Sequence, residues 1–147
     1  MIGNEKKLMY ENLCSKKAND VSNLTLAYIV DGLYELFIRL YVLERTGANI
    51  KGIHRQVIRA VSATGQAESF RKISEILNEY EINIYKRGRN THTSSMSKNA
   101  NPADYQTATG VETLLGFLFI DGKYERAEFI MEKMAEAAFS NENQENS

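Results

Sequence analysis

Apolar residues recur three and four positions apart along most of the chain, and strict alternation of apolar and polar residues persists nowhere. Spacing of three and four places side chains on one face of an α-helix, whereas alternation indicates a half-buried strand. One proline and nine glycines interrupt the pattern. Both residue types oppose helix formation, so their scarcity points the same way. The sequence therefore predicts an all-α fold.

Residues at the ends of the periodic segments set the expected helix boundaries. We expect helices over about residues 23–45, 53–60, 63–77, 79–89, 103–120 and 124–138. Ser22 or Asn23 caps the first helix and Ser62 caps the third, because short polar side chains accept hydrogen bonds from the first turn. Thr46-Gly47 ends the first helix in the manner of a C-terminal glycine.

Polar runs and turn residues mark the connections between these helices. The Ser-, Thr- and Asn-rich residues 90–102 predict a loop, and Asp-Gly at 121–122 predicts a turn. With 147 residues, 43% of them hydrophobic, the chain fits one domain with a real core. We divide it into an N-terminal extension (1–21), one folded domain (22–139) and a disordered tail (140–147) that offers nothing to bury.

The first long helix carries a narrow polar stripe on a mostly apolar surface. Asp31, Glu35 and Arg39 recur every four residues, which keeps them on one side of the helix. Burial of the remaining circumference predicts either a central helix or a dimer interface. The stripe has two interpretations, both open at this stage. One is a surface Glu35–Arg39 ion pair with Asp31 near the surface, and the other is a chemical role for the acids.

Glu112 is the only carboxylate in the apolar run 105–120. An unpaired buried charge is very costly, so this side chain either reaches solvent or meets a cation inside the domain. Magnesium suits both Asp31 and Glu112, because it takes oxygen ligands and keeps several waters beside one or two carboxylates. Such an ion supports phosphodiester hydrolysis. Thr109, one turn earlier, is a secondary candidate for orienting a water, although a capping or packing hydroxyl is the commoner role.

Charge is distributed unevenly along a chain whose formal net charge is -1. Nucleic-acid binding would therefore depend on local patches and not on the overall field. Residues 82–103 and 45–67 contain no acid. Their cations are Lys86, Arg87, Arg89, His92 and Lys98 in the first stretch, and Arg45, Lys51, His54, Arg55 and Arg59 in the second. Either stretch suits a phosphate backbone, but cations at residues 86–90 would also complement a solvated helix end.

Cysteine content and hydropathy indicate the cellular compartment of the protein. The single cysteine, Cys14, cannot form an internal disulfide or a thiolate zinc site, which favours a reducing cytoplasm. Charges interrupt the N-terminal residues too often for a signal peptide. Residues 24–43 approach the length of a membrane span, but Asp31, Glu35 and Arg39 argue against one. We expect a cytoplasmic protein without a membrane partner.

Four segments, in order and spacing, resemble the Mini-III enzymes, small relatives of ribonuclease III that lack a double-stranded RNA-binding domain. The segments are LAYIVDGLYELFIRLYVL, VSATGQAE, KRGRN and GVETLLGFLF, and the similarity extends over about residues 22–135. The resemblance implies a homodimeric, all-helical endonuclease of the ribonuclease III type that cuts double-stranded RNA with Mg²⁺. Its expected task is maturation of large-subunit (23S) ribosomal RNA, with a ribosomal protein that shapes the substrate as a further expected partner.

The resemblance also implies roles for individual residues. Asp31 and Glu112 fall on the family's carboxylate positions, which makes them the expected catalytic residues and metal ligands, with Glu35 as a secondary candidate. Phosphate contacts are expected from Lys86, Arg87, Arg89 and Lys98, with Arg55 and Arg59 as weaker candidates and Thr93, Ser94 and Ser95 reaching sugar or phosphate oxygens.

Several positions depart from the family pattern. Val30 replaces a glycine before Asp31, Gly32 replaces an alanine or serine, and Gly110-Val111 stands where Ala-Phe is usual. Larger ribonuclease III enzymes carry acids at the positions of Ala27 and Thr109, and both losses fit the Mini-III pattern. Fewer anionic ligands leave the number of bound metals open.

Three alternatives remain. A non-catalytic RNA-binding or ribosome-assembly module on the same fold would bind duplex RNA and leave it intact. A helical nucleotide pyrophosphohydrolase would need paired ExxE and ExxD motifs. Glu125 and Glu128 supply an ExxE, but no ExxD follows on a partner helix. A plain helical dimerisation domain leaves Glu112 and the acid-free basic stretches unexplained.

Overall fold

The computed structural model describes residues 13–91 and 101–140, and within these ranges it contains helices and no β-strand. Six α-helices occur there: α1 (Asn23–Arg45), α2 (Ile50–Val61), α3 (Ala63–Ile73), α4 (Glu79–Arg89), α5 (Pro102–Ile120) and α6 (Tyr124–Phe139). Two short 3-10 turns, η1 (Ala18–Asp20) and η2 (Ser74–Ile76), accompany them. The predicted all-α fold is confirmed. The predicted tail and most of the loop at 90–102 lie outside the described residues.

Side chains at the N-caps fix where the helices begin. Ser22 accepts a hydrogen bond from the backbone of Thr25, and Ser62 accepts one from Gly65, as the sequence predicted for both caps. Asn78 and Glu81 form a reciprocal capping box at the start of α4. These contacts satisfy backbone N–H groups that have no partner inside the helix.

Some boundaries differ from the prediction. α2 begins at Ile50, three residues early, because Asn49 supplies its cap. α3 ends at Ile73 and continues as the turn η2, so the expected long helix to residue 77 is interrupted. α1 ends at Arg45 as expected, but the expected left-handed glycine at its end was wrong, since Thr46 is extended and Gly47 has no positive φ. Among the described residues a left-handed glycine occurs at Gly122, in the predicted Asp-Gly turn.

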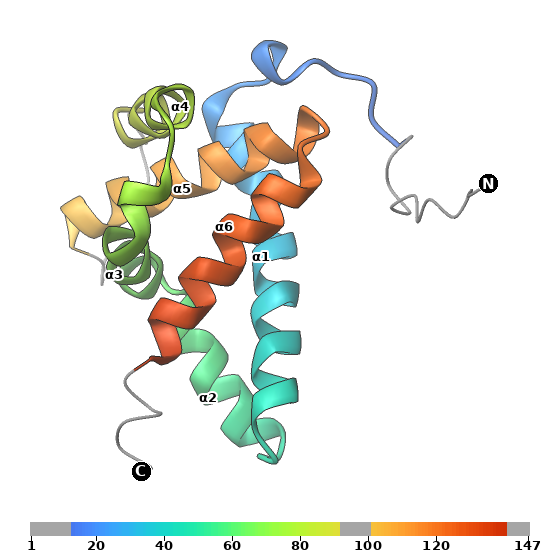
Figure 1. The fold of residues 1–147 in the computed structure, drawn as a ribbon, viewed down its shortest axis with the longest axis vertical. Helices are drawn as coiled ribbons and strands as arrows, with labels where there is room; N and C mark the ends of the chain where they lie inside the picture. The colour runs from blue at the N-terminus through green and yellow to red at the C-terminus, as the bar shows by residue number, and fades with distance from the viewer. Residues whose placement is uncertain (1–12, 92–100, 141–147) are drawn as a thin grey trace.

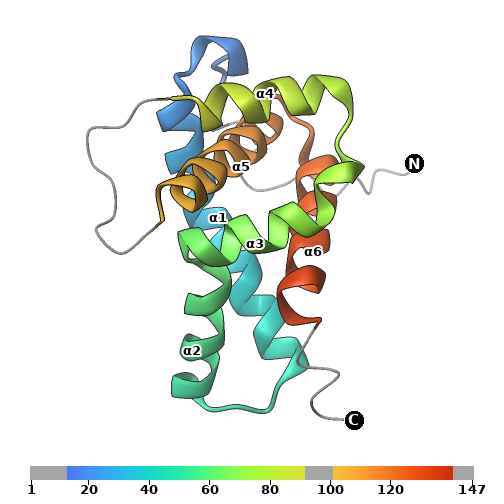
Figure 2. The same cartoon turned by 90° about the vertical axis from the view of Figure 1, so that its left-hand side faces the viewer.

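α5 is the central helix of the domain. It packs against α1, α3, α4 and α6, and ten of its residues between positions 107 and 118 are buried. Figure 1 shows α5 passing behind α6 and across the upper part of α1, while Figure 2 shows α4 lying along it. α1 buries one stripe, of which Leu26, Tyr34 and Ile38 are members, and leaves other apolar residues exposed. The sequence predicted that α1 is either the central helix or part of a dimer interface. The central helix is α5.

Two glycines allow α5 to approach its neighbours closely. A Cβ at Gly116 would overlap the backbone carbonyl of Leu26, so α1 and α5 cross in direct backbone contact. A Cβ at Gly88 would likewise overlap Thr113 and meet the Cα of Gly110 at 3.0 Å, which brings the end of α4 against α5. Larger side chains at either glycine would force the helices apart.

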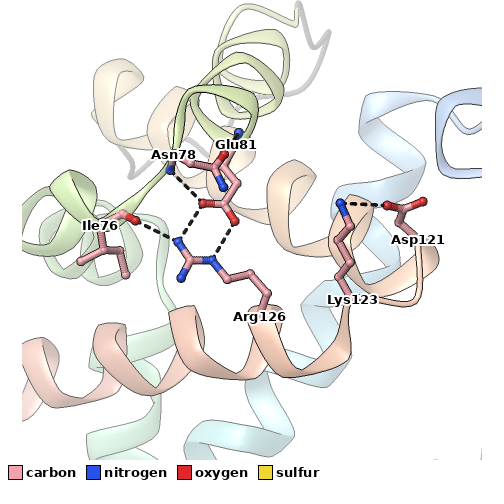
Figure 3. A network of polar contacts seen from close by, with 6 residues as sticks. All are labelled: Ile76, Asn78, Glu81, Asp121, Lys123 and Arg126. Atoms are coloured by element: carbon pink, nitrogen blue, oxygen red, sulfur yellow. Dashed lines mark hydrogen bonds and ion pairs between the residues drawn. The ribbon is translucent and has the colours of Figure 1, made fainter.

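A buried ion pair joins α4 to α6 (Figure 3). The Arg126 guanidinium donates to both carboxylate oxygens of Glu81, at 2.8 and 2.9 Å, and to the carbonyl of Ile76 at 2.8 Å. Burial alone would raise the pKa of Glu81, but these bonds and the backbone N–H of Asn78 outweigh it and lower that pKa. Glu81 is 2% exposed, and these hydrogen bonds compensate the cost of burying its negative charge. Its role is therefore structural.

We expect Arg126→Met to destabilise the fold by roughly 2–4 kcal/mol, because it leaves the Glu81 carboxylate buried without its partner. A fully enclosed pair would cost more, but the Arg126 side chain keeps 33% of its surface exposed. Urea unfolding measures the change. Arg39→Met is the matched control, because it removes an exposed pair with Glu35 at 3.3 Å and should cost less than about 1 kcal/mol. Equal losses in the two variants would contradict this assignment.

Candidate active site

The crossing of α1 and α5 brings the two predicted carboxylates together. Asp31 follows Leu26 by five residues on α1, and Glu112 precedes Gly116 by four on α5. With a rise of about 1.5 Å per residue, each lies roughly 6–8 Å along its helix from the point of backbone contact. Their charges interact, because Asp31 raises the pKa of Glu112. The structure therefore places both acids in one site.

Glu112 is the more strongly perturbed of the pair. Its pKa is raised to about 7, first by burial and second by the negative charge of Asp31, while the Gln66 side chain lowers it. No lysine or arginine is among the groups that shift it. A partly buried carboxylate beside a like charge, without a counter-cation, is the arrangement that a bound metal ion would relieve.

Asp31 lies at the solvent-exposed rim of the site. Its pKa is raised by partial burial and then by the charge of Glu35. Glu35 itself pairs with Arg39 at 3.3 Å, with 44% and 59% of the two side chains exposed. The surface ion pair considered from the sequence is therefore present, and Asp31 does lie near the surface. Asp31 nevertheless also faces the Glu112 charge, which that interpretation did not include.

A small buried polar cluster lies behind Glu112. It consists of Tyr34 from α1 and of Gln66 and Ser69 from α3, which are 1%, 3% and 2% exposed. Burial raises the pKa of Tyr34, and the Glu112 carboxylate raises it further. The Tyr34 hydroxyl and the Gln66 Oε1 atom have no hydrogen-bond partner in the described chain. The sequence-based prediction missed this cluster, although a glutamine at a core position of the helical pattern was a signal.

The donor atoms of this site fit a magnesium ion better than a softer metal. Two carboxylates meet there, and the described residues contain no group of three His, Cys, Asp or Glu side chains placed to hold a metal. Magnesium suits such a site because waters complete its coordination. The orphaned Gln66 Oε1 is an acceptor that such waters can use. Thr109 donates its hydroxyl to the carbonyl of Tyr105 at 3.0 Å, so this residue has the ordinary helix role.

The end of α4 that carries the basic cluster packs against α5, the helix that also carries Glu112. Gly88, inside this cluster, packs against the segment of α5 that contains Glu112. Lys86 and Arg87 are exposed, and the guanidinium of Arg87 lies 5.7 Å from the centroid of the Phe117 ring. Arg89 lies at the same distance from the ring of Tyr85. Two cations at the end of α4 are therefore held against aromatic rings of the domain.

Asn23 fixes the position of this cluster. Its side-chain amide donates to the Thr91 hydroxyl at 3.0 Å and to the carbonyl of Arg87 at 3.4 Å. Its backbone carbonyl accepts from the Thr113 hydroxyl at 3.3 Å. One residue thus ties together the start of α1, the end of α4 and the middle of α5. From the sequence, Asn23 was predicted only as a possible cap.

The remaining predicted residues lie apart from the carboxylates or beyond the described chain. Arg55 and Arg59 are exposed on α2, which packs against α1 and α3. Glu125 and Glu128 are exposed on α6. Five of the predicted loop residues, His92, Thr93, Ser94, Ser95 and Lys98, lie outside the described residues.

Comparison with known proteins adds an independent line of evidence. The model of the Ribonuclease III domain family matches residues 24–123, which is more than half of the chain and includes both carboxylates. The chain belongs to the ribonuclease III family. A Mini-ribonuclease 3 from Clostridium tetani is 39% identical over 127 residues, covering 86% of this chain and 84% of the relative. One from Symbiobacterium thermophilum is also 39% identical, covering 77% of this chain and 87% of the relative.

A solved structure supports the same fold. The crystal structure of protein FN1578 from Fusobacterium nucleatum superposes with a TM-score of 0.68 at 32% sequence identity. The match covers 80% of this chain and 95% of that one. The predicted resemblance and enzyme class, an endoribonuclease of the ribonuclease III family, are confirmed. A pyrophosphohydrolase is thereby excluded. Among the described helices, none is both long and apolar enough to cross a membrane.

We predict that Glu112 makes the stability of this ribonuclease III relative pH-dependent when no metal is bound. Its pKa rises from an ordinary 4.5 to about 7 in the folded chain, so the folded state holds the proton more tightly than the unfolded state. Stability should therefore be highest below pH 4.5, as far as this group is concerned, and fall until about pH 7, by up to roughly 3 kcal/mol.

Glu112→Gln should remove most of that fall. Urea unfolding in the presence of a chelator at pH 5 and pH 8 measures it. Glu128→Gln, which changes an exposed glutamate on α6, is the matched control and should behave like the wild type. An unchanged pH dependence in Glu112→Gln would show that the perturbation lies elsewhere.

Proposed function

We propose that this enzyme cleaves double-stranded RNA with Mg²⁺, and that Asp31 and Glu112 are the residues that bind the ion. The observation that supports this most strongly is the coupling of the two carboxylates at the α1–α5 crossing, with Glu112 lacking a counter-cation. The family membership gives the reaction class. The two carboxylates are the place where we propose that it occurs.

The two carboxylates have different tasks in this proposal. Glu112, held on the rigid central helix, anchors the ion from the inside, while the exposed Asp31 binds it at the rim where RNA arrives. Bound magnesium would supply charge stabilisation on the phosphate and a polarised attacking water. Because Glu112 must lose its proton to bind a cation, metal affinity should fall as pH drops below about 7.

Cations on α4 give the proposed RNA contacts. Lys86, Arg87 and Arg89 lie on α4, which packs against the helix that carries Glu112, whereas Arg55 and Arg59 are exposed on α2. Proteins recognise duplex RNA mainly through its shape and its backbone, which requires spaced cations and no base-reading groove. We infer a ribosomal RNA precursor of the large subunit as the substrate, as the resemblance to Mini-III enzymes suggests. Lys98 and a substrate-shaping ribosomal protein remain part of that expectation.

A second copy of the chain completes the proposal. Ile29, Leu36, Leu40 and Leu43 are 44% to 57% exposed on α1. At about 100° per residue they fall within roughly 60° of one another, on a single face. Stable homodimers bury apolar faces of this kind.

Two protomers related by a twofold axis would present two metal sites to opposite strands. We therefore expect a dimer in sedimentation equilibrium at micromolar concentration, and a monomer would contradict this.

The decisive assay combines a long RNA duplex, the purified chain and Mg²⁺. We expect cleavage that requires the ion and that falls at least about 100-fold in Asp31→Asn and in Glu112→Gln, since each variant lacks one of two protein ligands. Glu35→Gln is the matched control and should still cut, because Glu35 is engaged by Arg39. RNA that is retarded in a gel but left intact by the wild type would favour the non-catalytic binding module instead.

Phosphate binding can be tested separately, with a chelator present so that the RNA stays whole. Lys86→Gln combined with Arg87→Gln should weaken duplex binding and reduce the slope of log affinity against log salt by about one for each phosphate that is no longer neutralised. Lys133→Gln, on α6, is the control for removal of charge alone. An unchanged and steep slope in the double variant would remove the α4 cations from the interface.

A further inference from the structure

The polar cluster behind Glu112 contains two exceptions to a general rule. Buried polar atoms are bonded in the large majority of cases, and each unbonded one requires an explanation. The Tyr34 hydroxyl and the Gln66 Oε1 atom are both buried and both lack a partner in the described chain. Both side chains also interact with Glu112. The exceptions therefore gather at one carboxylate.

Gln66 is held rigidly from the α3 side. Its Nε2 atom donates to the carbonyl of Val61 at 2.9 Å, and its backbone carbonyl accepts from the Ser69 hydroxyl at 3.2 Å. The cap at Ser62 fixes the first turn of α3, in which Gln66 lies. Gly65 contributes as well, because a Cβ there would overlap the carbonyl of Arg59. The side-chain amide is thus held by Val61, and the backbone that carries it is fixed by the first turn of α3.

An amide group has two N–H donors, and Val61 takes one of them. The other is available to the Glu112 carboxylate, because α3 packs against α5 and the Gln66 side chain lowers the pKa of that carboxyl. The Oε1 atom is left as a free acceptor. A hydrated magnesium ion on Glu112 would bring water donors to such an acceptor. The Gln66 side chain could thereby donate to the Glu112 carboxylate and accept from a water bound to the ion.

We propose that Gln66 is a positioning residue of the catalytic site, whose amide bridges the Val61 carbonyl and the Glu112 carboxylate and holds that carboxylate in the orientation that binds the metal. Residues in this role fix the direction of a ligand without touching the ion. This inference rests on the proposed function of Glu112. The inference goes beyond that function because it assigns a residue of α3, with a neutral side chain, a part in metal affinity.

The test uses Mn²⁺ as the probe and the full chain without RNA, with binding measured by calorimetry. Gln66→Met keeps the volume and removes the donor, and should weaken Mn²⁺ binding about 10-fold or more. In the Glu112→Gln background the same change should have no further effect, because Gln66 acts only through that carboxylate. Ile130→Val, a fully buried change on α6, controls for a general decrease in stability.

The outcomes separate the two proposals. Wild-type affinity in Gln66→Met, or an equal weakening with and without Glu112, would overturn the role of Gln66. Equal affinity in the wild type and Glu112→Gln would instead overturn the metal site itself. If Gln66→Met does not fold, NMR of the wild type replaces it. The Gln66 side-chain amide signals should then shift with Mg²⁺ and in Glu112→Gln, and signals that stay unmoved would overturn the inference.

Discussion

The backbone contact between α1 and α5 is the constraint on which the site depends. Gly116 lies directly against the carbonyl of Leu26, so the two helices approach more closely than side chains normally permit. α5 is then enclosed by α1, α3, α4 and α6. A charged side chain on the middle section of α5 is therefore at least partly buried. Glu112 lies there, and its raised pKa follows directly from this enclosure and from the proximity of Asp31.

The buried Glu81 and the partly buried Glu112 show how the same residue type takes opposite roles. Glu81 is compensated by Arg126 and by the backbone of Asn78, and its pKa is lowered. Glu112 has a like charge beside it and a single neutral donor, and its pKa is raised. The first arrangement stabilises the packing of α4 on α6. The second costs stability in the metal-free chain, as functional sites often do, and is therefore the place to expect ligand binding.

The sequence predicted the helices and the caps at Ser22 and Ser62, and it singled out the two carboxylates, because each depends on local information. Helical spacing marks α1 and α5, and a lone acid in an apolar run marks Glu112. Sequence could not tell that Glu81 is buried too, since its partner Arg126 lies 45 positions away. Nor could it find Tyr34 and Gln66, whose importance comes from the packing of α3 against α5 and not from their own neighbours along the chain.

The role of α1 was likewise only half determined by its pattern. Periodicity showed that most of its surface is apolar, but the packing of the other helices decides which side is covered. α5 covers the stripe that contains Leu26 and Tyr34, and the face with Leu36 and Leu40 is left to solvent in the single chain. A helix of this kind both positions Asp31 and offers a surface for a second protomer.

The central claim is that Asp31 and Glu112 bind one divalent ion between α1 and α5. Crystals of the chain grown with Mn²⁺, which takes the same oxygen ligands as Mg²⁺, would locate that ion by its anomalous scattering. We expect a peak between the two carboxylates, within about 2.0–2.3 Å of an oxygen of each. A peak bound by only one of them, or located away from the crossing, would contradict the claim.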